Sequence, residues 1–309
     1  MFLRGKRVYI QRMVFSLTFV LTLLSAASFA GFFGALLGVG GGVFIVPIMV
    51  LAFHLPMKIA VAASLVSVIA TSNAGGSSYV DQHITNLRLG MFLEIATTLG
   101  ALSGSILALF LQEWVMLLVF TILLAYMGYS SFTTRKVDDQ RIAANDFSQA
   151  KADRFAAFLD LRGIYHDEAA GRDVTYVVTG VAAGAAISCL AGLASGLLGV
   201  GGGVLKVSAM NRYMNVPMKV AVGTSKLMIG VTAAVGSILF FMAGLIHFVV
   251  VGPVAIGTTV GATIGTMVMN RLHSRSLKWI FTLMMLYLAY GMMAKGLQMT
   301  FHFHIPRLG

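Results

Sequence analysis

The sequence predicts an all-α integral membrane protein made of two internally repeated multi-helix bundles with glycine-broken helices. Hydrophobic residues make up 58% of the 309 residues and charged residues only 11%, whereas soluble domains average about 45–50% and about 25%. The hexapeptide GVGGGV occurs at 38–43 and again at 199–204. Both copies lie within series of apolar segments, most of them long enough to cross a bilayer. Composition, repetition and segment length therefore indicate the same class.

The repeat extends well beyond the hexapeptide. An offset of 161 residues places GFFGALLGVGGGVFIVPIMVLAFHLPMKIAVAAS (31–64) over GLASGLLGVGGGVLKVSAMNRYMNVPMKVAVGTS (192–225) without a gap. The same offset pairs Gly100 with Gly261 and Gly104 with Gly265 much later in the chain. A fixed offset over this length indicates two copies of one structural unit.

The chain divides into five parts on this basis. We expect a basic N-terminal segment (1–13), a first transmembrane repeat (14–134), a polar connector (135–173), a second transmembrane repeat (174–298) and a C-terminal tail (299–309). The apolar segments are 14–37, 43–55, 58–80, 87–111 and 114–133 in the first repeat, and 175–198, 204–216, 219–241, 247–270 and 276–297 in the second. In the connector, RFAAFLDLRGIY (154–165) is interpreted either as a short amphipathic helix on the membrane surface or as a solvated linker.

The net charge of +11 is attributed to the positive-inside bias of membrane loops, and no nucleic-acid-binding motif accompanies it. If each repeat crosses five times, Arg212, Lys219, Arg271, Arg275 and Lys278 share one side, which would be cytoplasmic, and Glu113 lies outside. This distribution favours inverted repeats. The basic N-terminus argues against it, so ten or eight crossings and inverted or parallel repeats remain open.

The second apolar segment of each repeat is unusually short. About a dozen residues at about 1.5 Å each reach only some two-thirds of a ~30 Å hydrocarbon core. A short segment after a glycine break, at matching places in two repeats, indicates a transporter binding site. The helix that starts there presents unpaired N–H groups and a positive dipole end, which suit an anion. Close helix packing through small residues is the alternative.

The candidate substrate-binding residues combine these glycines with nearby lysine, hydroxyl and amide side chains. They are Gly40, Gly41, Gly42, Gly201, Gly202, Gly203, Lys206, Lys226, Ser64, Asn73, Thr224 and Ser225. Lys206 and Lys226 replace Ile45 and Leu65 of the first repeat. A lysine at a helix centre costs about 2.5–3.5 kcal/mol, so we expect both to face one midplane cavity that holds a dianion or two-headed anion. Snorkelling to an interface is the alternative.

Glu94, in GMFLEIATT, is the candidate for coupling substrate movement to protons, unless it simply pairs with a lysine. No cofactor is indicated. The single cysteine, Cys189, excludes an internal disulfide, and no H-E-x-x-H pattern suggests a metal. The sequence also shows no nucleophile–base cluster, so an enzyme is not expected.

GVGGGVFIVP, the Leu-Pro-Met-Lys that follows at 55–58, and AVAAS (60–64) with its counterpart AVGTS (221–225) resemble the sulfite exporter TauE/SafE family. The resemblance covers nearly the whole chain except the N-terminus and connector. It implies a secondary transporter, an exporter of sulfite or small organosulfonates, in the bacterial or archaeal inner membrane. Lys206 and Lys226 depart from the aliphatic residues expected in this family, which leaves the substrate open. A passive anion channel is the alternative function.

Overall fold

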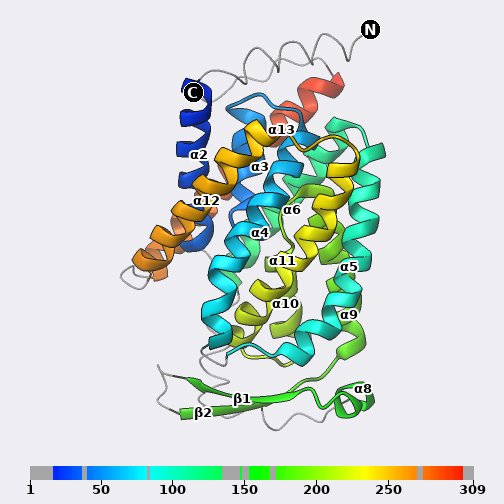
Figure 1. The fold of residues 1–309 in the computed structure, drawn as a ribbon. Helices are drawn as coiled ribbons and strands as arrows, with labels where there is room; N and C mark the ends of the chain where they lie inside the picture. Colours follow the sequence, from blue (N-terminus) through cyan, green and yellow to red (C-terminus); the bar gives the residue numbers. More distant parts are fainter. Residues whose placement is uncertain are drawn as a thin grey trace.

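The computed structural model describes residues 17–36, 40–81, 84–133, 147, 153–167, 172–269 and 274–301, and it forms a helical bundle with a β-hairpin at one end (Figure 1). In chain order the elements are α2 (Leu17–Leu36), α3 (Gly42–Leu51), α4 (Met57–Asp81), α5 (Leu87–Phe110), α6 (Glu113–Thr133), α8 (Arg154–Phe158), β1 (Arg162–Asp167), β2 (Arg172–Val177), α9 (Val181–Leu198), α10 (Gly203–Tyr213), α11 (Met218–Met242), α12 (Phe248–Met269) and α13 (Ser274–Phe301).

The helices have the length and composition of a membrane protein. Within the described ranges, α2, α5, α9, α11 and α12 are long and apolar enough to cross a bilayer. The outer face of α5 exposes large apolar side chains at Met91, Ile95 and Leu99, four residues apart, while Leu89 and Leu93 are fully buried. A helix that is apolar on both its buried and its exposed face is suited to a lipid environment. The predicted all-α membrane class is therefore confirmed.

The main helix pairs form between the two repeats. Helix α2 packs against α12, and α9, its counterpart in the second repeat, packs against α5; α4 pairs with α11 and α6 with α13. If each helix is replaced by its counterpart in the other repeat, the same set of helix pairs results. Local backbone conformation repeats as well, since His54 and its counterpart Asn215 both have positive φ, 53° and 56°.

Glycine allows two of these helix pairs to approach closely. A Cβ at Gly100 or Gly104 of α5 would overlap the carbonyl groups of Cys189 or Leu193 in α9, and a Cβ at Gly261 of α12 would overlap the Ser28 carbonyl of α2. Small residues at such spacing let membrane helices pack backbone to backbone. Residue numbers rise together along the α5–α9 contact, so these two helices run parallel, and the α2–α12 pair does the same.

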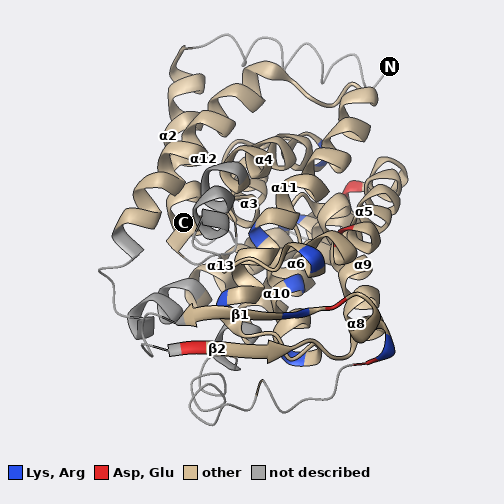
Figure 2. Cartoon of the chain, turned by 60° about the horizontal axis from the view of Figure 1, so that its bottom comes forward, with Lys and Arg blue, Asp and Glu red and all other residues tan. Residues whose placement is uncertain are grey.

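Hydrogen bonds show at which end of the bundle several of the helices begin. Arg88 at the start of α5 pairs with Asp160 before the hairpin at 2.8 Å, and the Thr179 N–H before α9 donates to the Met214 carbonyl after α10 at 3.1 Å. We call this the connector end. Figure 2 turns it toward the viewer and shows acidic and basic residues in the hairpin and beside α8.

Helix α4 begins at the opposite end of the bundle. The Met57 N–H donates to the Glu113 carboxylate, and the Lys58 ammonium donates to the Leu109 carbonyl where α5 ends. Helix α11 follows α10 and so begins at the connector end. The equivalent helices α4 and α11 therefore start at opposite ends.

Two expectations for the connector are corrected by the structure. Residues 175–177, expected to begin the first helix of the second repeat, belong to β2, and that helix begins at Val181. Only Arg154–Phe158 of the expected amphipathic stretch is helical, while Arg162–Asp167 is strand. Val174 and Tyr176 are buried at alternating positions of β2, and β-branched and aromatic residues at this spacing favour a half-buried strand over a helix.

Candidate functional site

The two glycine breaks touch each other inside the bundle. The Ser64 hydroxyl donates to the Gly199 carbonyl at 2.6 Å and lies 3.4 Å from the Gly42 carbonyl. Ser225, the counterpart of Ser64, donates to the Gly203 carbonyl at 3.3 Å. A Cβ at Gly42 would lie 2.6 Å from the Gly199 oxygen. Ser64 and Gly42 thus belong to the buried contact between the breaks, and Ser225 and Gly203 form a buried contact within the second repeat.

A pocket opens beside the first break. Its empty volume is about 690 Å³, including open space at its mouth. Elements of both repeats line it, with Gly34, Ala35, Gly40, Gly41, Val68, Thr71 and Ser72 from the first repeat and Lys226, Ile229, Ala262, Thr263 and Thr266 from the second. Of the predicted site residues, Gly40, Gly41 and Lys226 therefore come together here.

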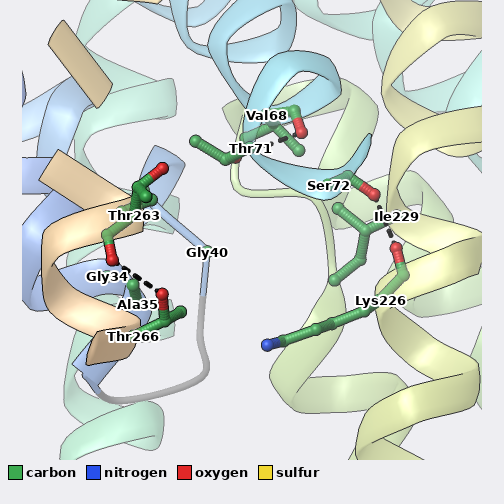
Figure 3. A pocket seen from close by; sticks show the side chains of 12 residues that line it. Gly34, Ala35, Gly40, Val68, Thr71, Ser72, Lys226, Ile229, Thr263 and Thr266 are labelled. Atoms are coloured by element: carbon green, nitrogen blue, oxygen red, sulfur yellow. Dashed lines mark hydrogen bonds between the residues drawn. The ribbon is translucent and has the colours of Figure 1, made fainter. Parts of the chain in front are cut away.

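Lys226 is the one ionisable residue among the described residues that line this pocket. In Figure 3 its side chain extends from α11 across the pocket, and its nitrogen points toward the side formed by Gly40 and Thr266. The Ser72 hydroxyl donates to the Lys226 carbonyl at 2.6 Å and so ties α4 to α11 at this point. The pocket wall thus carries one positive charge.

The start of α3 forms part of the same wall. Gly41 is the N-cap of α3, and its carbonyl accepts the first helical hydrogen bonds, from Phe44 and Ile45 at 3.1 Å each. Gly40 has φ +83°, and no atom lies within 4 Å of a Cβ built on it. The missing side chains leave the backbone at the positive end of the helix accessible from the pocket.

The four hydroxyl groups in the described part of the lining already donate hydrogen bonds. Thr71 donates to the Ser67 carbonyl at 3.1 Å, Thr263 to Thr259 at 2.9 Å and Thr266 to Thr263 at 2.8 Å, and Ser72 donates to Lys226. A hydroxyl with its single proton engaged offers only lone pairs. The positively charged groups of this wall are therefore the Lys226 ammonium and the N-terminal end of α3.

The second break holds a buried charged cluster instead. Lys206 is completely buried, and its ammonium donates to the Thr232 hydroxyl at 2.7 Å. Thr232 donates to Glu94 Oε1 at 2.8 Å, and the other carboxylate oxygen lies 3.8 Å from the Lys206 nitrogen. Thr97 also donates to Glu94, at 2.9 Å. Paired and hydrogen-bonded charges of this kind satisfy each other.

This arrangement separates the two lysines that we expected to face one cavity. Lys226 lines the pocket, whereas Lys206 is absent from its lining and lies against Glu94 and Thr232. The sequence predicted both lysines because each is a charge inside an apolar segment where the first repeat has an aliphatic residue. It did not predict which of them pairs with Glu94, a residue distant in the sequence.

The remaining predicted residues have other positions. Thr224 accepts a hydrogen bond from the Asn86 N–H at 3.0 Å. Gly201 and Gly202 have φ of +77° and +66°, and both pack against neighbouring atoms. Asn73 lies within α4, but its side chain is outside the described residues.

Three pocket residues on α12 were not predicted, namely Ala262, Thr263 and Thr266. Their segment reads as ordinary apolar helix, and only the spacing of two threonines along one helical face gave a signal. Among the described residues, no group of three or more His, Cys, Asp or Glu side chains could hold a metal ion.

The chain is similar in sequence to one protein family and to several proteins named as membrane transporters. A family model described as "Sulfite exporter TauE/SafE" matches residues 23–292. The chain is 24% identical over 275 residues to the "Probable membrane transporter protein YunE" of Bacillus subtilis (strain 168), covering 87% of this chain and 95% of that protein. It is 26% identical over 261 residues to a "Probable membrane transporter protein" of Haemophilus influenzae, covering 80% and 84%. No solved structure matches the chain.

Proposed function

Because the chain belongs to the sulfite exporter TauE/SafE family and is thus a multi-pass membrane transporter, we propose that it is a secondary transporter that exports sulfite or small organosulfonates across the plasma membrane. The substrate would bind in the pocket at the first glycine break. The observation that carries this proposal is the meeting of Lys226 with the start of α3 in one pocket wall.

The pocket suits an anion on electrostatic grounds. Lys226 supplies a full positive charge, and the N-terminus of a helix such as α3 supplies about half a charge. Both act within a membrane protein interior, where charges are screened less than in water. Among the described residues of the lining, none is acidic and none opposes an anion.

The packing of the repeats supports alternating access. The pocket lies between α2 and α4 of the first repeat and α11 and α12 of the second. The equivalent helices α4 and α11 begin at opposite ends of the bundle, as inverted repeats would. Transporters with inverted repeats bind substrate between the repeats and expose the site to each side in turn.

Charge distribution and the position of the pocket support export as the direction of transport. Arg88, Arg212 and Lys219 lie at the connector end, on α5, α10 and α11, and the positive-inside rule assigns such an end to the cytoplasm. Ala35 and Thr266 belong to the last turns of α2 and α12, which run toward the connector end. The pocket is therefore nearer the proposed cytoplasmic side, from which an exporter takes up its substrate.

Glu94 remains our candidate for proton coupling. Its side chain is 13% exposed and pairs with Lys206 through Thr232. Protonation of this carboxylate would leave the Lys206 charge without its counter-charge, and the contact between α5, α10 and α11 would weaken. Coupling of this kind predicts that a proton gradient drives substrate movement.

Counterflow in proteoliposomes tests the transporter against the channel alternative. Liposomes containing the full chain and unlabelled sulfite should accumulate radiolabelled sulfite above its outside concentration, because a carrier exchanges substrate across the membrane. Lys226→Met should abolish this exchange, whereas Lys219→Met, an exposed residue on the same helix, should preserve it. Flux that only dissipates gradients would favour the passive channel, and no flux of sulfite or of any sulfonate would contradict the proposal.

A further inference from the structure

We propose that α8 and the residues on either side of it bind the headgroup region of the bilayer at the connector end. Phe155 and Phe158 insert between the lipids, and the arginines beside them bind the phosphates of anionic headgroups. None of these residues lines the pocket of the proposed function, and lipid binding here does not depend on the substrate.

Helix α8 exposes two large aromatic side chains. Phe158 is 86% exposed and Phe155 is 64% exposed, whereas Ala156 between them is buried in the same apolar cluster as Leu89 of α5. Residues three apart lie on the same face of a helix. One side of α8 therefore packs on the bundle, and another presents two phenyl rings. An exposed apolar patch of this kind marks a surface that binds a partner or a membrane.

Hydrogen bonds hold this short helix at the level where two other helices enter the membrane. The Asp153 carboxylate, before α8, accepts from the Val181 N–H at the start of α9 at 3.1 Å. The Asp160 carboxylate, after α8, accepts from Arg88 at the start of α5 at 2.8 Å. Figures 1 and 2 show α8 beside this end of α5 and α9. Both helices are long and apolar enough to cross a bilayer.

The lipid-facing surface of α5 extends to the same level. Leu87 in its first turn is exposed, and Met91 and Ile95 follow on the same face. The 24 residues of α5 span about 36 Å at about 1.5 Å each, which is more than the ~30 Å hydrocarbon core. The first turn of α5 therefore reaches the headgroup region. Because Arg88 in this turn pairs with Asp160, α8 lies at headgroup depth and continues the surface that faces lipid.

The charges beside the phenyl rings suit anionic headgroups. Arg154 is exposed, and Arg88 and Arg162 both donate to Asp160, at 2.8 and 2.6 Å. Three arginines thus face two carboxylates, those of Asp153 and Asp160. A guanidinium has five N–H groups, and it binds phosphate oxygens in a bidentate manner. Aromatic and basic residues together are typical of segments that lie in the membrane interface.

Spin labels on the full chain in nanodiscs test this placement, in a Cys189→Ala background that removes the single cysteine. The label is attached to Phe158→Cys and to two reference variants, Leu99→Cys on the lipid-facing side of α5 and Ile164→Cys on β1. Ile164 is 66% exposed on the strand face opposite the buried Tyr165. The measurement is the ratio of collisions with oxygen to collisions with a water-soluble nickel complex. We expect this ratio to be severalfold higher at Phe158→Cys than at Ile164→Cys, and to lie below that at Leu99→Cys.

Lipid composition tests the role of the arginines. The collision ratio at Phe158→Cys should be higher in nanodiscs of phosphatidylglycerol than in nanodiscs of phosphatidylcholine. Adding Arg154→Gln and Arg162→Gln should abolish this difference. The matched changes Arg154→Lys and Arg162→Lys keep the charge and should preserve it. Equal ratios in the two lipids with both arginines present would overturn the binding of anionic headgroups.

Two other results would overturn the placement of α8 in the membrane interface. A ratio at Phe158→Cys equal to that at Ile164→Cys would mean that α8 belongs to a solvated linker. Low collision rates with both reagents would mean that protein covers the phenyl rings, either a second copy of this chain or another partner. Neither result bears on anion transport, which the counterflow experiment measures separately.

Discussion

The two glycine breaks share a hexapeptide but differ in what surrounds them. A Cβ built on Gly40 would meet open space, whereas a Cβ built on its counterpart Gly201 would lie 2.8 Å from the Ile229 side chain. Gly41 caps α3 with φ −62°, but Gly202 caps α10 in the left-handed conformation with φ +66°. The first break faces a pocket, and the second is packed against its neighbours.

A few substitutions account for this difference. Lys226 in the pocket corresponds to Leu65, which is completely buried and lies beside Gly236 of α11. Lys206 corresponds to Ile45, and Glu94 corresponds to Ala255. The charged pair therefore combines one departure from each repeat. The two repeats contain similar short helices after their glycine breaks. The altered side chains make the first break a candidate binding site and place a buried ion pair at the second.

The largest effect should come from breaking the buried pair. Lys206→Met leaves the Glu94 carboxylate, 13% exposed, without its counter-charge, and breaking a buried pair costs about 3–5 kcal/mol. We expect a marked loss of thermal stability in detergent, most of it recovered in the double variant Lys206→Met/Glu94→Gln. If Lys206→Met is as stable as the parent and has lost anion binding, Lys206 belongs to the anion site and the comparison fails.

The sequence predicted the helices well because the membrane imposes a strong signal. The apolar segment at 87–111 corresponds to α5 at Leu87–Phe110, and the short segment at 43–55 corresponds to α3 at Gly42–Leu51. Every backbone polar group in lipid must be satisfied within a helix, so helices appear as long apolar runs. Thr175–Val177 was misassigned because a short apolar run fits a strand as well as a helix.

The sequence could not decide the division of labour between the breaks. Lys206 and Lys226 are both lysines that follow the second GVGGGV, and only the packing of α5 beside α11 brings Glu94 to one of them. Glycines gave a similar ambiguity, since Gly42 packs against the Gly199 carbonyl while Gly41 faces the pocket. Tertiary contacts between the repeats determine both outcomes.

Removing the charge at the first break should weaken binding without unfolding the chain. Lys226 is only partly buried, so Lys226→Met keeps the fold. We expect sulfonate affinity to fall between about tenfold and a hundredfold, or about 1.4–2.8 kcal/mol, as measured by calorimetric titration in nanodiscs. Lys219→Met, at an exposed position in the first turn of the same helix, should bind like the parent. Unchanged affinity in Lys226→Met would move the anion away from this pocket.

Matched glycine substitutions should separate the breaks by a smaller amount. Gly202→Ala forces a side chain into a left-handed conformation with the Ala191 carbonyl oxygen 2.6 Å from its Cβ, and the conformation alone costs roughly 1–2 kcal/mol. Gly41→Ala has ordinary φ and a nearest neighbour at 3.7 Å, so stability should stay within about 0.5 kcal/mol. Its Cβ would lie against Gly31, Thr258 and Ile45 in ordinary van der Waals contact. Equal loss of stability in the two variants would mean that the breaks are structurally equivalent.

The smallest effect concerns Asn86, which links the hairpin to α11 by hydrogen bonds. Asn86 donates through its side chain to the Tyr176 hydroxyl at 2.9 Å and through its N–H to Thr224 at 3.0 Å. The counterpart of Thr224 in the first repeat is Ala63, which has no hydroxyl. Tyr176→Phe removes one hydrogen bond, worth about 0.5–1.5 kcal/mol, and should increase hydrogen exchange in β1 and β2.

This effect should not vary with pH around neutrality. Burial raises the pKa of Tyr176 above its usual value, so its protonated hydroxyl contributes stability below the pKa of the unfolded state, and that contribution disappears as pH rises through the raised pKa. Asn86→Ala should have the larger effect, because Asn86 also caps α5 by accepting from the Leu89 N–H at 3.0 Å, and losing such a cap costs about 1 kcal/mol. Unchanged hydrogen exchange of β1 and β2 in both variants would show that the Asn86 hydrogen bonds do not stabilise the hairpin.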